Sequence, residues 1–145
     1  MSFIFNQVKT LVSKKRLDLE SDRICVVLVN NYFTPDKDNQ FLSEIPKINI
    51  SSDPVELKNK SFENYVFDAE DICFPCICGN DITGILIYQG CKNHHLIGFI
   101  DKAFSLPAIP NGGDIIVTWD NGTNKIFEMK EDFIDLQEDM DGAQV

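Results

Sequence analysis

The chain has 145 residues, of which 43% are hydrophobic and 25% are charged, and its formal net charge is −10. This length fits one domain that buries about two-thirds of its unfolded surface, and the composition is that of an ordinary soluble globule. No apolar run approaches the roughly 20 residues that span a bilayer, and the one basic cluster, Lys14-Lys15-Arg16, is too small to release counterions from a polyphosphate. We therefore expect no membrane partner and no nucleic-acid partner.

The first predicted element is an amphipathic helix over residues 3–15. Its apolar face consists of Phe5, Val8, Leu11 and Val12, which recur at helical spacing. After a polar turn, residues 23–30 (RICVVLVN) predict a central strand buried on both faces. The N-terminus lacks an uninterrupted apolar core of signal-peptide type, so we expect the protein to remain in the cytosol, where thiols stay reduced.

The rest of the chain predicts short strands separated by clusters of Gly, Asn, Asp or Pro. The expected strands are residues 47–51, 55–60, 65–67, 72–78, 82–88, 95–102, 114–119 and 125–129. Asn121-Gly122 is the strongest hairpin signal, and Trp119 is expected in the core. Together these patterns predict a mainly β fold, an antiparallel β-sandwich or barrel-like domain over residues 1–129 with one short N-terminal helix.

Residues 130–145 form an acidic C-terminal tail with six acids and one lysine. The tail is interpreted either as a frayed terminus or as an arm that becomes ordered on a neighbouring subunit. In the first long loop, Tyr32 and Phe33 are apolar residues in a polar setting. They are expected either to pack beneath the loop or to be exposed for a partner.

A zinc site is one hypothesis for the segment from Asp71 to His95, which holds four of the five cysteines and both histidines. Cys73-x2-Cys76 and Cys91-x2-His94 would supply two ligand pairs for a tetrahedral ion. The spacing between the pairs is acceptable for such a site. A strand over this segment is not the usual setting of a zinc knuckle.

Strand geometry argues against convergence of these cysteines. In a strand over residues 72–78, Cys76 and Cys78 share one face and Cys73 lies on the other, so the three converge only if Pro75 introduces a bulge. The main interpretation is therefore buried core thiols, with zinc ligation and late crosslinks between subunits as open alternatives. It applies to Cys73, Cys76, Cys78 and Cys91.

Other chemical constellations give weaker signals. His94-His95 could pair with any cysteine as a base for a nucleophile, but the spacing selects none. The acids Asp68, Glu70, Asp71 and Asp81 show no EF-hand pattern and are interpreted as solvated. Residues 111–114 (NGGD) lack the lysine of a phosphate loop and predict a turn entering a strand. We assign no catalytic, cofactor-binding or metal-ligating residue.

The chain as a whole resembles a diverse family of small virion structural proteins of tailed bacteriophages, over about residues 5–129. The resemblance lies in the order of the segments NYFTPDKDNQFLSEIP, VELKNKSFE, FDAEDICF, ITGILIYQG and PNGGDIIVTWDNGTNKIF. It implies a capsid decoration or cement protein without enzymatic activity, which binds between major capsid protein subunits of the head shell. A homo-oligomer is implied as well, a trimer being one form, in a virion assembled in the cytoplasm of the bacterial host.

Two alternatives to this function remain open. The first is a neck, tail or baseplate position in the same particle. The second, from another class, is a small zinc-binding regulatory domain. The cysteines depart from the family pattern, so the resemblance does not explain them and favours a role specific to this particle.

Overall fold

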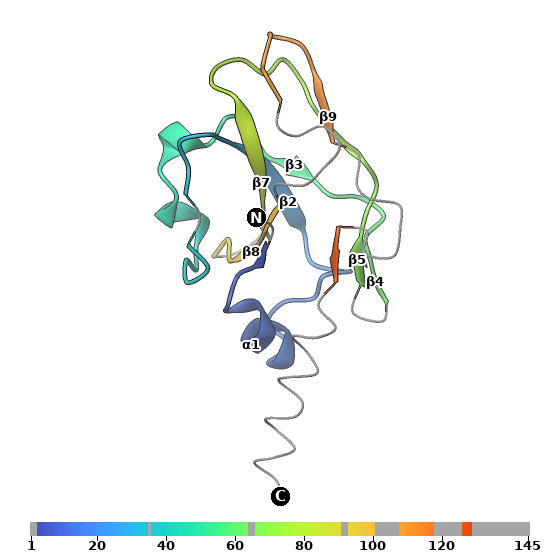
Figure 1. Ribbon diagram of the computed structural model, residues 1–145. Helices are drawn as coiled ribbons and strands as arrows, with labels where there is room; N and C mark the ends of the chain where they lie inside the picture. Colours follow the sequence, from blue (N-terminus) through green and yellow to red (C-terminus); the bar gives the residue numbers. More distant parts are fainter. Residues whose placement is uncertain are drawn as a thin grey trace, which may run out of the picture.

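The computed structural model describes residues 3–34, 36–63, 66–90, 93–100, 108–117 and 126–128. Within these ranges the chain forms ten short strands, one α-helix and two 3-10 turns (Figure 1). The strands are β1 (Phe3–Ile4), β2 (Ile24–Asn30), β3 (Val55–Glu56), β4 (Ser61–Glu63), β5 (Val66–Asp68), β6 (Ile72–Phe74), β7 (Ile82–Gln89), β8 (Leu96–Ile100), β9 (Ile115–Val117) and β10 (Phe127–Glu128). The helix is α1 (Val8–Ser13), and the 3-10 turns are η1 (Leu42–Glu44) and η2 (Lys47–Asn49).

The centre of the molecule is a five-stranded antiparallel sheet in the order β1-β8-β7-β2-β3. Its longest strands, β2 and β7, pair from Ile24 opposite Gln89 to Asn30 opposite Ile82. Every residue of β2 is buried. A strand buried on both faces has a continuous apolar run rather than an alternating one, and this confirms the predicted central strand.

Two smaller antiparallel sheets, β10-β5-β4 and β6-β9, lie beside the central sheet, on the right in Figure 1. The inward side chains of β6 and β9 are buried, whereas Cys73 and Ile116 between them are exposed. Phe67 of β5 and Phe74 of β6 belong to the same buried cluster as the residues of β2 and β7. The described chain is thus mainly β, with antiparallel sheets around one hydrophobic core, as predicted.

The helix is shorter than the predicted range of 3–15. Phe3 and Ile4 form β1 and pair with Phe99 and Gly98 of β8. Only Val8–Ser13 is helical, and its inward face carries the predicted residues Val8 and Leu11. Apolar spacing does not distinguish a helix from a short strand followed by a helix, and here the free edge of β8 takes up the first residues.

Several predicted strands also change. Residues 47–51 were expected to be a strand, but Lys47–Asn49 forms the turn η2 and Ile50 makes one bridge with Val29. The predicted strand 55–60 ends at Glu56, and Asn59, at φ 52°, turns the chain toward β4, which the pattern does not predict. Trp119, Asn121-Gly122 and the tail 130–145 lie outside the described residues. Of the helices in the described ranges, none is long and apolar enough to cross a membrane.

Candidate functional site

The cysteine-rich segment runs through and beyond β6, in the ribbon formed with β9. The regular ladder ends at Phe74 and resumes at Ile77, which exchanges hydrogen bonds of 2.9 and 2.8 Å with the Gly112–Gly113 pair. Between them Pro75 and Cys76 form a kink, and Cys76 has φ 56°, an uncommon value outside glycine. Proline has no N–H to donate to a ladder. The predicted strand 72–78 is therefore cut short at Phe74.

The kink turns three thiols away from the core. The inward residues of the segment are Ile72, Phe74 and Ile77. Pro75 and Cys76 are both exposed, so together they occupy one outward position and the alternation shifts by one residue. Cys73, Cys76 and Cys78 are all exposed as a result.

The interpretation of these thiols as buried core fillers is wrong for Cys73, Cys76 and Cys78. Among the cysteines that the structure describes, Cys25 of β2 is the buried one. Cys91, the remaining cysteine, lies outside the described residues. The sequence indicates that the three cysteines share one face only if Pro75 introduces a bulge. The kink at Pro75 and Cys76 is such a bulge, and it places the three thiols on the solvent side.

The described members of the hypothetical zinc site, Cys73, Cys76 and His94, are not brought together, and Cys91 lies outside the described residues. His94 lies beyond the end of β7, where its ring is 5.6 Å from that of Tyr88. In the described ranges no group of three or more His, Cys, Asp or Glu side chains is placed to hold a metal ion. Asp68 lies in β5 and Asp71 precedes β6, and the described ranges hold no group of three or more acids placed for a cation.

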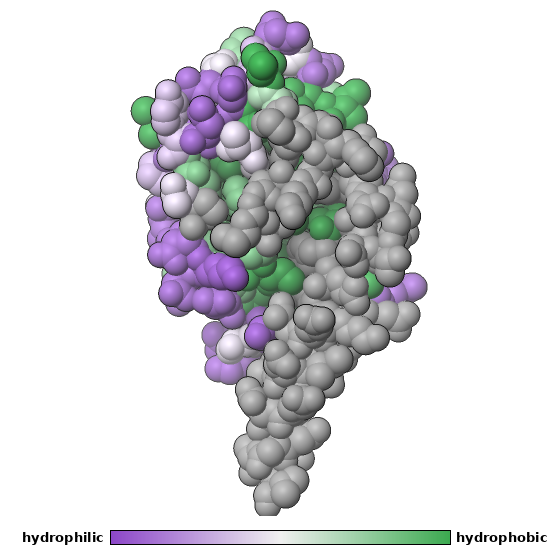
Figure 2. Space-filling model, in the orientation of Figure 1, coloured by the Kyte–Doolittle hydropathy of each residue, from purple (hydrophilic) through white to green (hydrophobic). Residues whose placement is uncertain are grey.

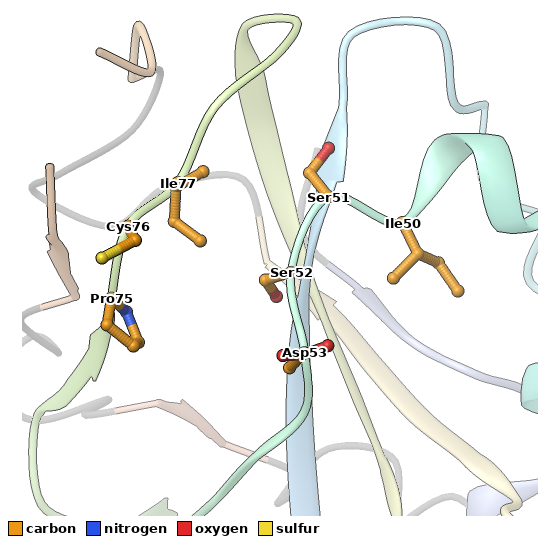
Figure 3. Close-up of a pocket in the computed structure, with 7 residues that line it drawn as sticks. All are labelled: Ile50, Ser51, Ser52, Asp53, Pro75, Cys76 and Ile77. Carbon is orange, nitrogen blue, oxygen red and sulfur yellow. The ribbon is translucent and has the colours of Figure 1, made fainter. Parts of the chain in front are cut away.

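A hollow of about 350 Å³ lies between residues 50–53 and the kink at residues 75–77 (Figure 3). The first wall is held against β2, because Ser51 N–H donates to Leu28 O at 2.8 Å and Leu28 N–H donates to Ser52 Oγ at 2.9 Å. The Cys76 sulfur points away from this wall, whereas the Ile77 side chain points toward it (Figure 3). The side chains lining the hollow include no histidine, lysine or arginine that could activate a thiol.

The loop at residues 111–114 forms the predicted turn. Gly112 has φ 87°, in the region that favours glycine, and Gly113 N–H donates to Asn111 Oδ1 at 2.9 Å. The Asp114 carboxylate accepts from Cys76 N–H at 3.1 Å, which ties the turn to the kink. The turn then enters β9.

A polar cluster lies at the end of the molecule that carries α1. Gln89 is buried, and its Nε2 donates to Arg16 O at 3.2 Å and to Asp22 Oδ2 at 2.8 Å. Because both of these partners are acceptors, the orientation of the amide is fixed and its Oε1 faces His95 Nδ1 at 3.1 Å. The proton of neutral His95 therefore lies on Nδ1, and Nε2 carries the lone pair.

His95 is held as a neutral ring. Burial lowers the pKa of His95, and the Arg16 guanidinium lowers this pKa further. The ring also lies 5.1 Å from that of Phe41, which forms an isolated bridge with His95. Gln89 and Phe41 are not nucleophiles, so these contacts fix His95 against the loop before η1 and bring no reacting group to Nε2.

The opposite end of the molecule carries exposed apolar side chains. Tyr32, Ile48 and Ile109 are 71%, 82% and 80% exposed. Hydrophobic residues reach the surface at this upper end of the molecule among hydrophilic ones (Figure 2). We call Tyr32, Ile48 and Ile109 the apolar end. Of the two apolar residues in this loop, Phe33 packs against the core and Tyr32 is exposed, so each takes one of the two expected placements.

Asn30, a buried residue at the end of β2, organises the apolar end. Its Nδ2 donates to Ile48 O at 2.9 Å, and its Oδ1 accepts from Tyr32 N–H and Asn49 Nδ2, both at 3.1 Å. The beginning of the connection between β2 and β3, at Tyr32, and its later part, at Ile48 and Asn49, are thereby held on one side chain.

Ile109, the third residue of the apolar end, is positioned by strand pairing. Asn30 pairs with Ile82 in β7, and Ile82 bridges to Ala108, the neighbour of Ile109. Asn30 carries no signal of this role in the sequence, because a polar residue at the end of an apolar run resembles an ordinary strand end.

Comparison with known proteins adds no relative: no protein-family model, no curated protein and no solved structure matches the chain.

Proposed function

We propose that this chain is a structural protein of a tailed-phage virion that decorates the head shell by binding between major capsid protein subunits. The proposal is supported by the sequence resemblance over about residues 5–129 and by the mainly β, antiparallel fold. The resemblance consists of turn and strand patterns, so it bears on the fold and on the context of the protein. A decoration protein works by shape and many weak contacts rather than through a pocket.

The observation that carries the proposal is the apolar end. Three large side chains there are exposed, and the hydrogen bonds of Asn30 hold the two segments that carry Tyr32 and Ile48. A preorganised surface loses little conformational entropy on binding. Burying a large apolar side chain contributes about 2 kcal/mol, so three such anchors would contribute about 6 kcal/mol to the centre of an interface.

The proposed architecture of the whole chain is a single β-sandwich or barrel-like domain over residues 1–129 with a tail over residues 130–145. The shared hydrophobic core of the three sheets supports the first part. The acidic composition of the tail supports its separation from the domain. In this proposal the tail is an arm that contacts a neighbouring subunit, and the assembled form is a homo-oligomer such as a trimer.

The zinc-binding regulatory domain is not proposed. The described residues do not bring three ligands together, and the thiols of Cys73 and Cys76 face solvent. The neck, tail or baseplate position stays an alternative outcome of the experiment below, because a different location in the same particle would leave the fold and the resemblance unchanged.

The test is to locate and count the chain in purified virions of the virus that encodes it. Cryo-electron microscopy should show it over the joints between capsid subunits, and quantitative mass spectrometry should find a copy number comparable with the number of such joints. Copies confined to one ring at the neck or tail would replace the decoration role by the alternative. Absence from the particle would overturn both.

A binding experiment tests the apolar end itself. Shells purified without the chain are incubated with the wild-type protein or with Ile48→Lys or Ile109→Lys, and bound protein is measured after sedimentation. Each variant should lose binding while unfolding like the wild type, because both side chains are exposed. Lys15→Asp, an exposed change near α1, is the matched control and should bind normally.

A further inference from the structure

The row of exposed thiols, Cys73, Cys76 and Cys78, has a chemistry that the proposed function does not use. Free cysteine is among the most buried residue types in proteins, so three exposed thiols in six residues are unusual. The kink at Pro75 and Cys76 places all three on the solvent side of one ribbon. We call this set the thiol row.

Pairing between Cys76 and Cys78 is unfavourable. Residues that face the same side of a strand are spaced about 6.4 to 6.8 Å apart, which is at the upper end of the Cα separations that a disulfide bridges, about 4.4 to 6.8 Å. Ile77, between Cys76 and Cys78, is held by two backbone hydrogen bonds to the Gly112–Gly113 pair and cannot shorten that step without breaking them. Cys25 is buried in β2, whereas the three thiols of the row face solvent.

Pairing between two copies meets neither obstacle. Two identical rows related by a two-fold axis through Cys76 place Cys76 opposite Cys76 of the second copy and Cys73 opposite its Cys78. Such an isologous contact needs only one self-complementary patch. The row also lies beside an apolar side chain, because Ile116, 59% exposed, is directly opposite Cys73 across the ladder.

We propose that the thiol row is the contact at which two copies of this chain join through a disulfide. The inference does not depend on the virion role, since it rests on the ribbon geometry alone. A thiolate of one copy attacks a small disulfide such as oxidised glutathione, forms a mixed disulfide and releases one glutathione thiol. A thiolate of the second copy then attacks the mixed disulfide, forms the S–S bond between the copies and releases the second thiol, so the two electrons and two protons end on glutathione.

Electrostatics sets the conditions of pairing. Each copy carries a formal net charge of −10, so two copies repel each other. At physiological ionic strength the screening length is about 8 Å. The rate of crosslinking should therefore rise with salt concentration.

The experiment uses the full chain, purified reduced and then exposed to oxidised glutathione, with products separated on non-reducing gels. The wild type should form a covalent dimer that reductant returns to monomer. The variant with serine at positions 73, 76 and 78 should lose the dimer and keep its unfolding midpoint, because the replaced groups are exposed. Cys91→Ser is the control and should still dimerise.

A second variant separates a specific contact from random collision. Ile116→Asp leaves every thiol in place but adds a charge beside Cys73, so it should slow dimer formation, whereas Tyr32→Asp at the apolar end should not. A monomer under all conditions would overturn the proposal. So would a disulfide formed within one chain, a dimer that disappears in Cys91→Ser, or equal rates for the two aspartate variants.

Discussion

Replacing Asn30 is the sharpest test of how the apolar end is built. Asn30 is 3% exposed and makes three hydrogen bonds, with Ile48 O, Tyr32 N–H and Asn49 Nδ2. Asn30→Leu keeps the number and branching of the side-chain heavy atoms, although its methyl groups are bulkier than the amide, and it leaves all three partners without their bond. The substitution therefore removes the polar contacts and adds a packing cost at a buried position.

The expected loss follows from the bond count. A hydrogen bond contributes about 1 kcal/mol net, and more when a buried partner is left unsatisfied, so three bonds give a loss of about 3 kcal/mol in the free energy of unfolding. For a domain of this size, that loss lowers the melting temperature by about 9 °C. At low pH, Asn30→Asp should lose less free energy of unfolding than the leucine variant, because its carboxyl oxygen still accepts the Tyr32 N–H bond.

The measurement is urea unfolding followed by circular dichroism, with Asn49→Ala as the matched control. Asn49→Ala removes one of the three bonds and should cost about 1 kcal/mol. If Asn30→Leu cost no more than this control, Asn30 would not organise the two segments and the reasoning would be refuted. The leucine variant should also lose shell binding, because Tyr32 and Ile48 are no longer held.

Three further predictions concern other parts of the fold. An added Cβ at Gly84 would lie 2.4 Å from Phe99 Cε1 and 3.2 Å from Val29 Cγ2. Gly84→Ala should therefore lower the free energy of unfolding by about 2 kcal/mol, and adding Phe99→Leu should restore part of it. An unchanged urea midpoint would contradict this packing. Because the pKa of folded His95 lies below its ordinary value of 6.5, the stability that its neutral form contributes is complete above that value and is lost as the pH falls toward the folded pKa. His95→Gln should therefore show a flatter decline of stability with acidification, and curves of equal slope would exclude this role. In Cys91→Ser, three thiols should react quickly with a disulfide reagent and Cys25 only on unfolding, whereas two or fewer fast thiols would contradict the exposed row.

The sequence predicts the centre of the fold well because long apolar runs leave little choice. ICVVLVN in β2 and ITGILIYQ in β7 are buried almost throughout, as continuous runs of strand length require. Edge elements are predicted less well. Residues 47–51 have strand-like composition, but Asn49 bonds to Asn30 and the chain turns there.

The thiols show a second limit of pattern reasoning. Regular alternation along residues 72–78 would place Cys73 on one face and Cys76 and Cys78 on the other. The αL residue at Cys76 shifts the alternation by one residue, so Cys73, Cys76 and Cys78 all face solvent. Pro75 indicates where the ladder breaks, but not how the chain resumes. The resumption depends on Gly112 and Gly113, which are far away in the sequence.

The pairing of β2 with β7 also bears on how the chain reaches its fold. Ile24 meets Gln89 and Asn30 meets Ile82, so the central ladder forms only after a long intervening segment has closed. Sheets built from such distant pairings fold slowly, in milliseconds to seconds. Until β7 arrives, the edge of ICVVLV that pairs with β7 is free, and β3 pairs only with Cys25 and Val26 on the other edge. An uncharged run of high β-propensity with a free edge has the signature of a segment that pairs with other chains. The residues that form the best-buried strand of the native protein are therefore its main aggregation risk during synthesis, and slower synthesis at low temperature should raise the yield of folded chain.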